Sequence, residues 1–178
     1  EHAVARGALG EVAAEHGHAG VEIRGHRGPG CRMRVRPLAL KRIVSNLVDN
    51  AIRYTASRPP QDRGPAAQHS TVSVSVHQHA TGAAVLQVQD DGPGIAPADR
   101  SKVFDRFYRV PGSNAEGAGL GLAIVKQIAQ RHGARIELGD ATPAPGLRVT
   151  VVFAAATAPA TSGAPTTADE EAAQRIPR

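Results

Sequence analysis

The sequence predicts an α/β fold, because stretches with the two-residue period of strands alternate along the chain with stretches that have the period of helices. Composition supports this prediction: 41% of the 178 residues are hydrophobic but only 3% are aromatic, so the core must be built mainly from Val, Ile, Leu and Ala. The length suits one domain with a tail.

Alternating apolar and polar residues predict six short strands. They cover residues 21–24, 31–35, 72–76, 84–89, 135–138 and 147–153. The first two flank a Gly-Pro-Gly turn at 28–30, which predicts a hairpin with a loose loop. Helical spacing predicts one helix over residues 38–54, with Pro37 in its first turn, and a second over residues 120–132.

Three segments divide the chain. Residues 1–17 have helical spacing over a stretch too short to bury its own apolar face, so we expect the end of a helix whose partner is absent. Residues 18–153 contain every predicted strand and both longer helices, with a polar loop predicted at 55–70. Residues 154–178 are rich in Ala, Pro and Thr, and we expect a disordered tail. Since no Met begins the chain, we expect a piece of a longer protein.

Charge, cysteine content and hydrophobic pattern argue against several classes of protein. The formal net charge of +5 permits phosphate-rich ligands but does not indicate nucleic acid, because the few aromatic residues are clustered rather than spread along a basic stripe. A single cysteine, Cys31, excludes an internal disulfide framework and fits a reducing compartment. No apolar run approaches the roughly 20 residues that cross a bilayer, and the N-terminus lacks the layout of a signal peptide.

The first predicted helix carries two Asn residues on one face. Asn46 and Asn50 are one turn apart, with Arg53 adjacent and Tyr54 next to it. An amide that faces a core is unfavourable unless it is hydrogen-bonded, which suggests a ligand. Exposed or locally capping Asn residues would give the same pattern, so this motif alone leaves both interpretations open.

Three more motifs follow. Residues 90–95 (Asp-Asp-Gly-Pro-Gly-Ile) come directly after a strand and offer carboxylates and a close backbone approach, although an ordinary turn would look the same. Residues 103–109 (Val-Phe-Asp-Arg-Phe-Tyr-Arg) hold three of the five Phe and Tyr residues, and such a turn can simply pack its aromatics into the core. Residues 117–125 place glycines before a helix, where backbone N–H groups form an anion site. Their spacing fits neither a Rossmann motif nor a P-loop.

Together and in this order, the four motifs resemble the N, G1, F and G2 boxes of the catalytic ATP-binding domain of sensor histidine kinases. That domain belongs to a wider group shared with type II topoisomerases, heat-shock chaperone ATPases and mismatch-repair ATPases. The resemblance covers residues 21–153. It implies a two-layer α/β sandwich with a mixed sheet of about five strands, helices on one face of the sheet, and ATP bound between the helices and a mobile lid.

The resemblance also implies roles for single residues. Asp90 would accept a hydrogen bond from the exocyclic amine of adenine, which favours ATP over GTP. Asn50 would offer its side-chain oxygen to Mg²⁺, and Asn46 would lie near the phosphates. Arg53, which stands where many relatives carry Lys, and Tyr54 would border the nucleotide.

The lid would extend over residues 96–116, with Arg106 and Arg109 as the candidates for contact with the γ-phosphate. The other nucleotide contacts that the resemblance implies are Gly92, Gly94, Ile95, Gly117, Gly119, Leu120, Gly121 and Leu122.

The residue at position 46 distinguishes a kinase from a hydrolase within this group. Relatives that hydrolyse ATP carry a Glu at this position, which activates water, whereas this chain carries Asn46. An amide cannot take that proton, so a histidine kinase is favoured over an ATPase or an anti-sigma serine kinase. A regulatory ATP-binding module stays an alternative. None of the eight His residues has the context of a phosphoacceptor, so we expect the acceptor on a dimerisation domain outside this chain. The resemblance further implies a response regulator as partner, a homodimer in the full-length protein, and a cytoplasmic location next to a membrane anchor.

Overall fold

The computed structural model describes residues 21–27, 33, 35–56, 70–112, 117–143 and 145–155. The elements in chain order are β1 (Val21–Arg27), α2 (Pro37–Ala56), β2 (Ser70–Gln78), β3 (Ala84–Asp90), the short 3-10 helix η2 (Lys102–Phe104), α3 (Gly121–Arg131), β4 (Arg135–Asp140) and β5 (Leu147–Phe153). In this part of the chain, no helix is both long and apolar enough to cross a membrane.

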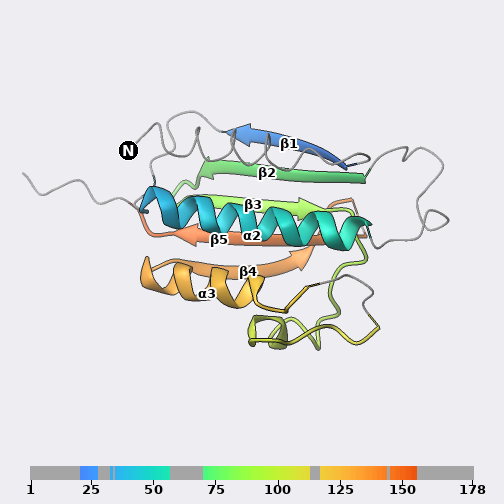
Figure 1. The fold of residues 1–178 in the computed structure, drawn as a ribbon. Helices are drawn as coiled ribbons and strands as arrows, with labels where there is room; N and C mark the ends of the chain where they lie inside the picture. Colours follow the sequence, from blue (N-terminus) through green and yellow to red (C-terminus); the bar gives the residue numbers. More distant parts are fainter. Residues whose placement is uncertain are drawn as a thin grey trace, which may run out of the picture.

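Five strands form one mixed sheet in the order β1-β2-β3-β5-β4. β1 and β2 are parallel, and the other three pairs are antiparallel. Figure 1 shows α2 and α3 side by side across the same face of this sheet. The expected two-layer α/β sandwich, with helices on one face of a mixed sheet, is confirmed.

Apolar periodicity explains the core between the two layers. The residues of α2 that face the sheet recur at helical spacing, from Leu40 to Thr55, and are buried. Alternate residues of β2 and β5 belong to the same core, because successive side chains of a strand point to opposite faces. The inward-facing residues of these two strands are Val72, Val74, Val76, Leu147, Val149, Val151 and Phe153.

One predicted element is not as expected. Met33 and Val35 lie outside any strand, although the alternation at 31–35 predicted one. β1 instead pairs in parallel with β2, along the register from Val21 opposite Ser70 to Arg27 opposite Val76. Parallel neighbours need a crossover, and α2 lies between these strands in the chain. The predicted turn at 28–30, the helix end at 1–17, and most of the predicted loop and tail lie outside the described residues.

The other predicted elements are confirmed to within a few residues. Both helices begin near the predicted positions, with Pro37 in the first turn of α2 and Gly121 as the first residue of α3. In Figure 1 the C-terminal half of α2, the end of β3 and the loop that leads into α3 lie on the same side of the molecule. The residues of the four motifs are therefore brought together there.

Candidate functional site

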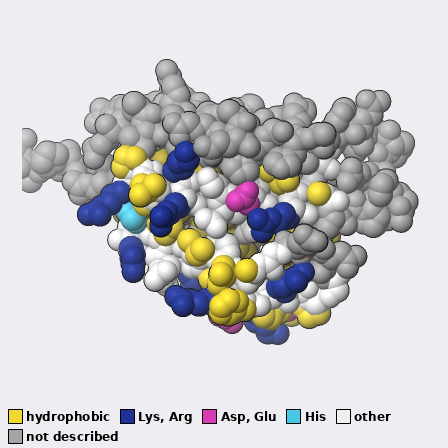
Figure 2. Space-filling view, viewed as in Figure 1, with side chains coloured by type: hydrophobic (Ala, Val, Ile, Leu, Met, Phe, Trp, Pro, Cys, Tyr) yellow, Lys and Arg dark blue, Asp and Glu magenta, His cyan; other side chains and the backbone are white. Residues whose placement is uncertain are grey.

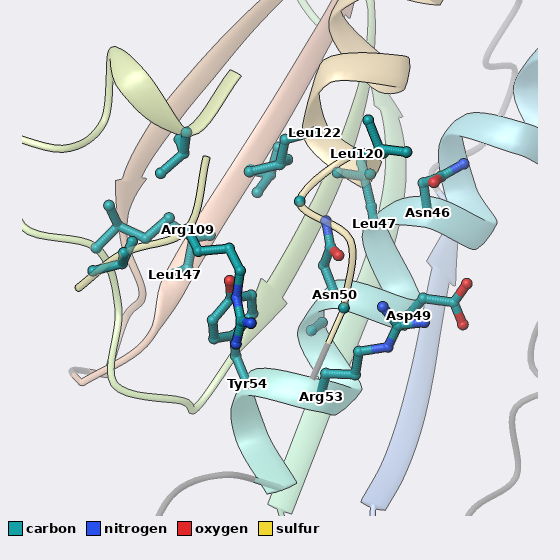
Figure 3. Close-up of a pocket in the computed structure, with 18 of the residues that line it drawn as sticks. Asn46, Leu47, Asp49, Asn50, Arg53, Tyr54, Arg109, Leu120, Leu122 and Leu147 are labelled. Carbon is teal, nitrogen blue, oxygen red and sulfur yellow. The ribbon is translucent and has the colours of Figure 1, made fainter. Parts of the chain in front are cut away.

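A pocket opens between α2, α3, the segment after β3 and the start of β5. Figure 3 shows Asn50 and Tyr54 of α2 facing Leu122 of α3 and Leu147 of β5 across it. The residues that line it are Asn46, Leu47, Asp49, Asn50, Ala51, Arg53, Tyr54, Val88, Asp90, Ile95, Val103, Tyr108, Arg109, Val110, Gly117, Ala118, Gly119, Leu120, Gly121, Leu122, Ile124, Leu147 and Val149.

Asp90 is the buried acid of this pocket. Its Oδ1 accepts two backbone hydrogen bonds, from the N–H of Gly92 at 2.9 Å and from the N–H of Leu147 at 3.1 Å. Burial raises the pKa of Asp90 from 3.8 to about 6, the two backbone hydrogen bonds oppose that shift, and the neighbouring charge of Asp91 adds to it. Its Oδ2 has no hydrogen-bond partner in the described part of the chain, so one carboxylate oxygen remains for a donor in the pocket.

Glycine contacts hold the chain tightly around this carboxylate. Gly146 has φ +148°, and a Cβ there would overlap the carbonyl oxygen of Asp90. A Cβ on Gly94 would lie 3.1 Å from the carbonyl oxygen of Gly146. Gly92 and Gly94 do not line the pocket themselves. They let the backbone run close beside Asp90 instead.

The start of α3 forms a second part of the pocket, next to Asn50. A Cβ on Gly121 would lie 2.9 Å from Nδ2 and 3.0 Å from Oδ1 of Asn50, so this glycine leaves the space that the amide fills. The N-cap residue, Leu120, makes no side-chain hydrogen bond to the helix start. The first N–H groups of α3 therefore have no side-chain cap, and they carry the positive end of the helix dipole. Such a helix start favours an anion.

The segment after η2 lies against the glycine-rich loop. The N–H of Phe107 donates to the carbonyl oxygen of Gly119 at 2.9 Å. Gly119 has φ +67°, and a Cβ there would come within 2.8 Å of the backbone of Phe107 and Tyr108. The Tyr108 hydroxyl donates to Oδ1 of Asp99 at 2.8 Å. The predicted lid thus closes one wall of the pocket by backbone contact.

Cationic side chains gather around the same opening. A Cβ on Gly117 would lie 2.9 Å from Nη1 of Arg53, so the glycine loop passes directly over this guanidinium. Figure 3 shows Arg109 extending from the lid toward Tyr54. On the helical face drawn in Figure 2, Lys and Arg side chains clearly outnumber Asp and Glu. This charge suits a polyphosphate ligand.

The Asn46 side chain lines the pocket about one turn before Asn50. Its Nδ2 donates to the carbonyl oxygen of Arg42 at 2.8 Å, so its donor side is held by the helix itself. Its side chain has no carboxylate with which to take a proton.

Most of the predicted site residues meet in one place. Ten of them line the pocket together with Asn46 and Asn50: Arg53, Tyr54, Asp90, Ile95, Arg109, Gly117, Gly119, Leu120, Gly121 and Leu122. Arg106 is exposed and does not line it. The apolar walls were missed, above all Val88, Leu147 and Val149. Their alternation in β3 and β5 marked them as inward-facing, but nothing in the pattern separates a pocket wall from the rest of the core.

Comparison with known proteins decides the family. The family model described as histidine kinase-, DNA gyrase B- and HSP90-like ATPase matches residues 35–157. The chain belongs to this family. It is also 33% identical to the solved structure of a mycobacterial sensor histidine kinase, MprB, with a TM-score of 0.63, and the match covers 84% of this chain and 91% of that one. The chain is therefore an ATP-binding catalytic domain of a sensor histidine kinase.

Two further relatives agree with this assignment. The sensor protein kinase PmrB of Pseudomonas aeruginosa is 44% identical over 116 residues, which are 64% of this chain and 22% of that protein. The sensor protein QseC of Salmonella typhi is 42% identical over 106 residues, 60% of this chain and 20% of that protein. The matched part of this chain thus spans about a fifth of the length of these sensor proteins.

Proposed function

We propose that this domain binds Mg-ATP and transfers the γ-phosphate to a His on a dimerisation domain outside this chain, for relay to a response regulator. One observation carries the proposal: the buried Asp90 and the Asn50 amide, which lies against the uncapped start of α3, line the same pocket. The first can bind a base, and the second, with the helix start, can bind phosphates.

Asp90 would recognise adenine through Oδ2. The exocyclic amine of adenine donates a hydrogen bond, whereas guanine presents a carbonyl oxygen at that position, which a carboxylate repels. Ile95, Leu147 and Val149 supply apolar walls for a flat base. ATP should therefore bind more tightly than GTP.

The polyphosphate would lie between the start of α3 and the cations. The N–H groups that follow Leu120 and the charges of Arg53 and Arg109 would favour an anion in this part of the pocket. An oxygen of Asn50 suits Mg²⁺, which prefers oxygen ligands and keeps several waters and phosphate oxygens in its shell. The described residues hold no cluster of three or more His, Cys, Asp or Glu, which fits a metal held mainly by its phosphates. When bound, Mg²⁺ would neutralise phosphate charge.

The residues of the pocket favour transfer over hydrolysis. The polar side chain one turn before Asn50 is Asn46, whose amide cannot deprotonate a water. The domain would thus bind and orient ATP and shield its charge. The nucleophile would come from another domain. Positioning of this kind can account for roughly 7–11 kcal/mol of a reaction barrier.

The remaining partners are part of the same proposal. A phosphoacceptor hairpin, a homodimer and a cytoplasmic position beside a membrane anchor fit a domain that spans about a fifth of its sensor relatives. A nucleic-acid partner is not expected, since the few aromatic residues are clustered in the lid rather than spread along a basic stripe.

The test is incubation with ATP labelled at the γ-phosphate, with and without a separately supplied dimerisation hairpin from the full-length protein. Label should appear on the hairpin alone, in an acid-labile and base-stable form. Label on His132 or another residue of this chain would show that the acceptor has been misplaced. Rapid release of inorganic phosphate by the domain alone would favour an ATPase.

A further inference from the structure

Arg100 joins two loops that each carry residues of the pocket wall. Its Nε donates to the carbonyl oxygen of Ile95 at 3.0 Å, and its Nη2 forms an ion pair with Oδ1 of Asp140. Ile95 lies on the segment after β3, whereas Asp140 is the last residue of β4. One guanidinium therefore bridges the start of the lid and the β4–β5 connection.

The Asp140 side of this bridge is connected to the buried Asp90 through backbone hydrogen bonds. The next residue, Ala141, donates its N–H to the carbonyl oxygen of Gly146 at 3.0 Å. Leu147 follows, lines the pocket, and donates its own N–H to Asp90. The Ile95 side of the bridge is a second wall of the same pocket. Arg100 thus ties together the two walls that flank Asp90.

Exposure and geometry show which contact matters more. The Arg100 side chain is 22% exposed and that of Asp140 is 73% exposed. An ion pair with so exposed a partner contributes little by itself. The hydrogen bond to the Ile95 carbonyl is partly buried, and a planar guanidinium can serve both partners at once, which an ammonium group cannot do as well.

We infer that Arg100 is a positioning residue for the base: it holds the Ile95 wall at a fixed separation from the Leu147 wall and so sets how well the pocket distinguishes adenine from guanine. This inference rests on the proposed binding of ATP. A residue that only stabilised the fold would not change the ratio of affinities for two bases.

The test compares Arg100→Gln and Arg100→Lys with a matched control, Arg135→Gln. Arg135 lies on β4 and pairs with Glu137 at 2.8 Å, so the control also removes an Arg–carboxylate pair from that strand, but neither residue of this pair lines the pocket. Calorimetry would give the affinities for ATP, ADP and GTP, and thermal melting would report stability.

For Arg100→Gln we expect ATP and ADP to weaken by the same factor, roughly 5- to 10-fold, with a smaller loss for GTP, so that base selectivity falls. Arg100→Lys should be intermediate, because it keeps the charge near Asp140 but loses the Nε–H donor. Arg135→Gln should leave all three affinities and their ratio unchanged.

Should Arg100→Gln fail to fold, Asp140→Asn removes the ion pair from the other side. It should lower the affinities for ATP and ADP by the same factor, about twofold. Unchanged base selectivity in the Arg100 variants, with or without a lower melting temperature, would overturn the inference. A wild-type domain that binds no ATP would instead reject the proposed function.

Discussion

The two ends of the pocket are built in different ways. At the base end, Asp90 is only 6% exposed and is held by two backbone N–H groups, with glycines pressed against its backbone. At the phosphate end, Arg53 and Arg109 are exposed, and the glycine-rich loop lies over Arg53. The base end is fixed by backbone packing, and the phosphate end consists of long side chains and a loop.

This difference shows how one pocket can combine recognition with turnover. A rigid carboxylate can select a base before the reaction begins, since its position does not depend on the ligand. Long cationic side chains and a loop can adjust as the phosphate is transferred and the product leaves. Changes at the base end should therefore affect every adenine nucleotide, and changes at the phosphate end should affect ATP more than ADP.

The largest effect is expected where the backbone is tightest. Gly146→Ala would force a Cβ onto the carbonyl oxygen of Asp90 at a φ of +148°. We expect the free energy of unfolding to fall by roughly 2–4 kcal/mol, measured by denaturant titration. Gly112→Ala is the control, because Gly112 has φ +78° with nothing within 4 Å of its added Cβ, and should cost about 1 kcal/mol. Equal losses in the two variants would show that the base end is not tightly packed.

Asp90→Asn comes next, because it replaces the free acceptor of the carboxylate by a donor. ATP and ADP affinity should fall together by roughly 1–3 kcal/mol, measured by calorimetry. Circular dichroism should be unchanged, because an amide oxygen can still accept the N–H groups of Gly92 and Leu147. Retention of wild-type affinity would rule out the assignment of Asp90 to adenine.

Asn50→Ala changes the phosphate end alone. Removing the amide oxygen beside Gly121 should weaken Mg²⁺-dependent ATP binding by about tenfold, and ADP binding without metal should change by less than about twofold. A matching loss of both would indicate damage to the packing between α2 and α3 rather than the loss of a metal ligand.

The raised pKa of Asp90 predicts a pH dependence at the base end. Since this pKa is about 6, lowering the pH from 7.5 to 5 should protonate most of the carboxyl groups and reduce ATP affinity by about tenfold. The other ionisable groups that line the pocket are Asp49, Arg53, Tyr54, Tyr108 and Arg109. Asp90→Asn is the control, because it keeps these groups and the titration of ATP itself but lacks the Asp90 carboxyl. The affinity of this variant for ATP should vary much less between pH 7.5 and 5.

The same group should change the stability of the ligand-free domain in the opposite direction. Because the folded pKa lies above the ordinary value of 3.8, the contribution of Asp90 to stability is fully present below about pH 4 and is lost as the pH rises through about 6. Wild type should therefore lose stability relative to Asp90→Asn between these pH values. A constant difference between their free energies of unfolding would contradict the raised pKa.

The smallest effect is expected in the lid. Arg109 lines the pocket and Arg106 does not, although both belong to the same motif. Arg109→Gln should weaken ATP relative to ADP by about threefold, and Arg106→Gln should leave that ratio unchanged. If Arg106→Gln has the larger effect, the lid must rearrange when nucleotide binds.

Periodicity was sufficient to predict most of the fold. Leu40, Ile43 and Leu47 specify the buried face of α2, and the alternation of Val72, Val74 and Val76 specifies β2. The strand predicted at 31–35 was wrong at Met33 and Val35, because alternation over so few residues does not require a partner strand. The parallel pairing of β1 with β2 is a long-range contact that local pattern cannot encode.

The site was predictable at the positions where a polar residue stands in place of the apolar residue that a core would favour. Asn50 on the inner side of a helix and Asp90 at the end of a strand are conspicuous because polar groups that face a core need a partner. Leu147 and the bridge through Arg100 were not predictable. A leucine in a strand looks like any core residue, and the residues that Arg100 contacts, Ile95 and Asp140, are brought together only by the fold.

The central claim is that the two ends of the pocket bind different parts of one nucleotide. The most direct measurement is calorimetric titration of wild type, Asp90→Asn and Asn50→Ala with Mg-ATP and with metal-free ADP. Asp90→Asn should lose affinity for both ligands by the same factor, whereas Asn50→Ala should lose it for Mg-ATP alone. The same pattern of loss in both variants, or no binding by wild type, would contradict the division of the pocket into a base end and a phosphate end.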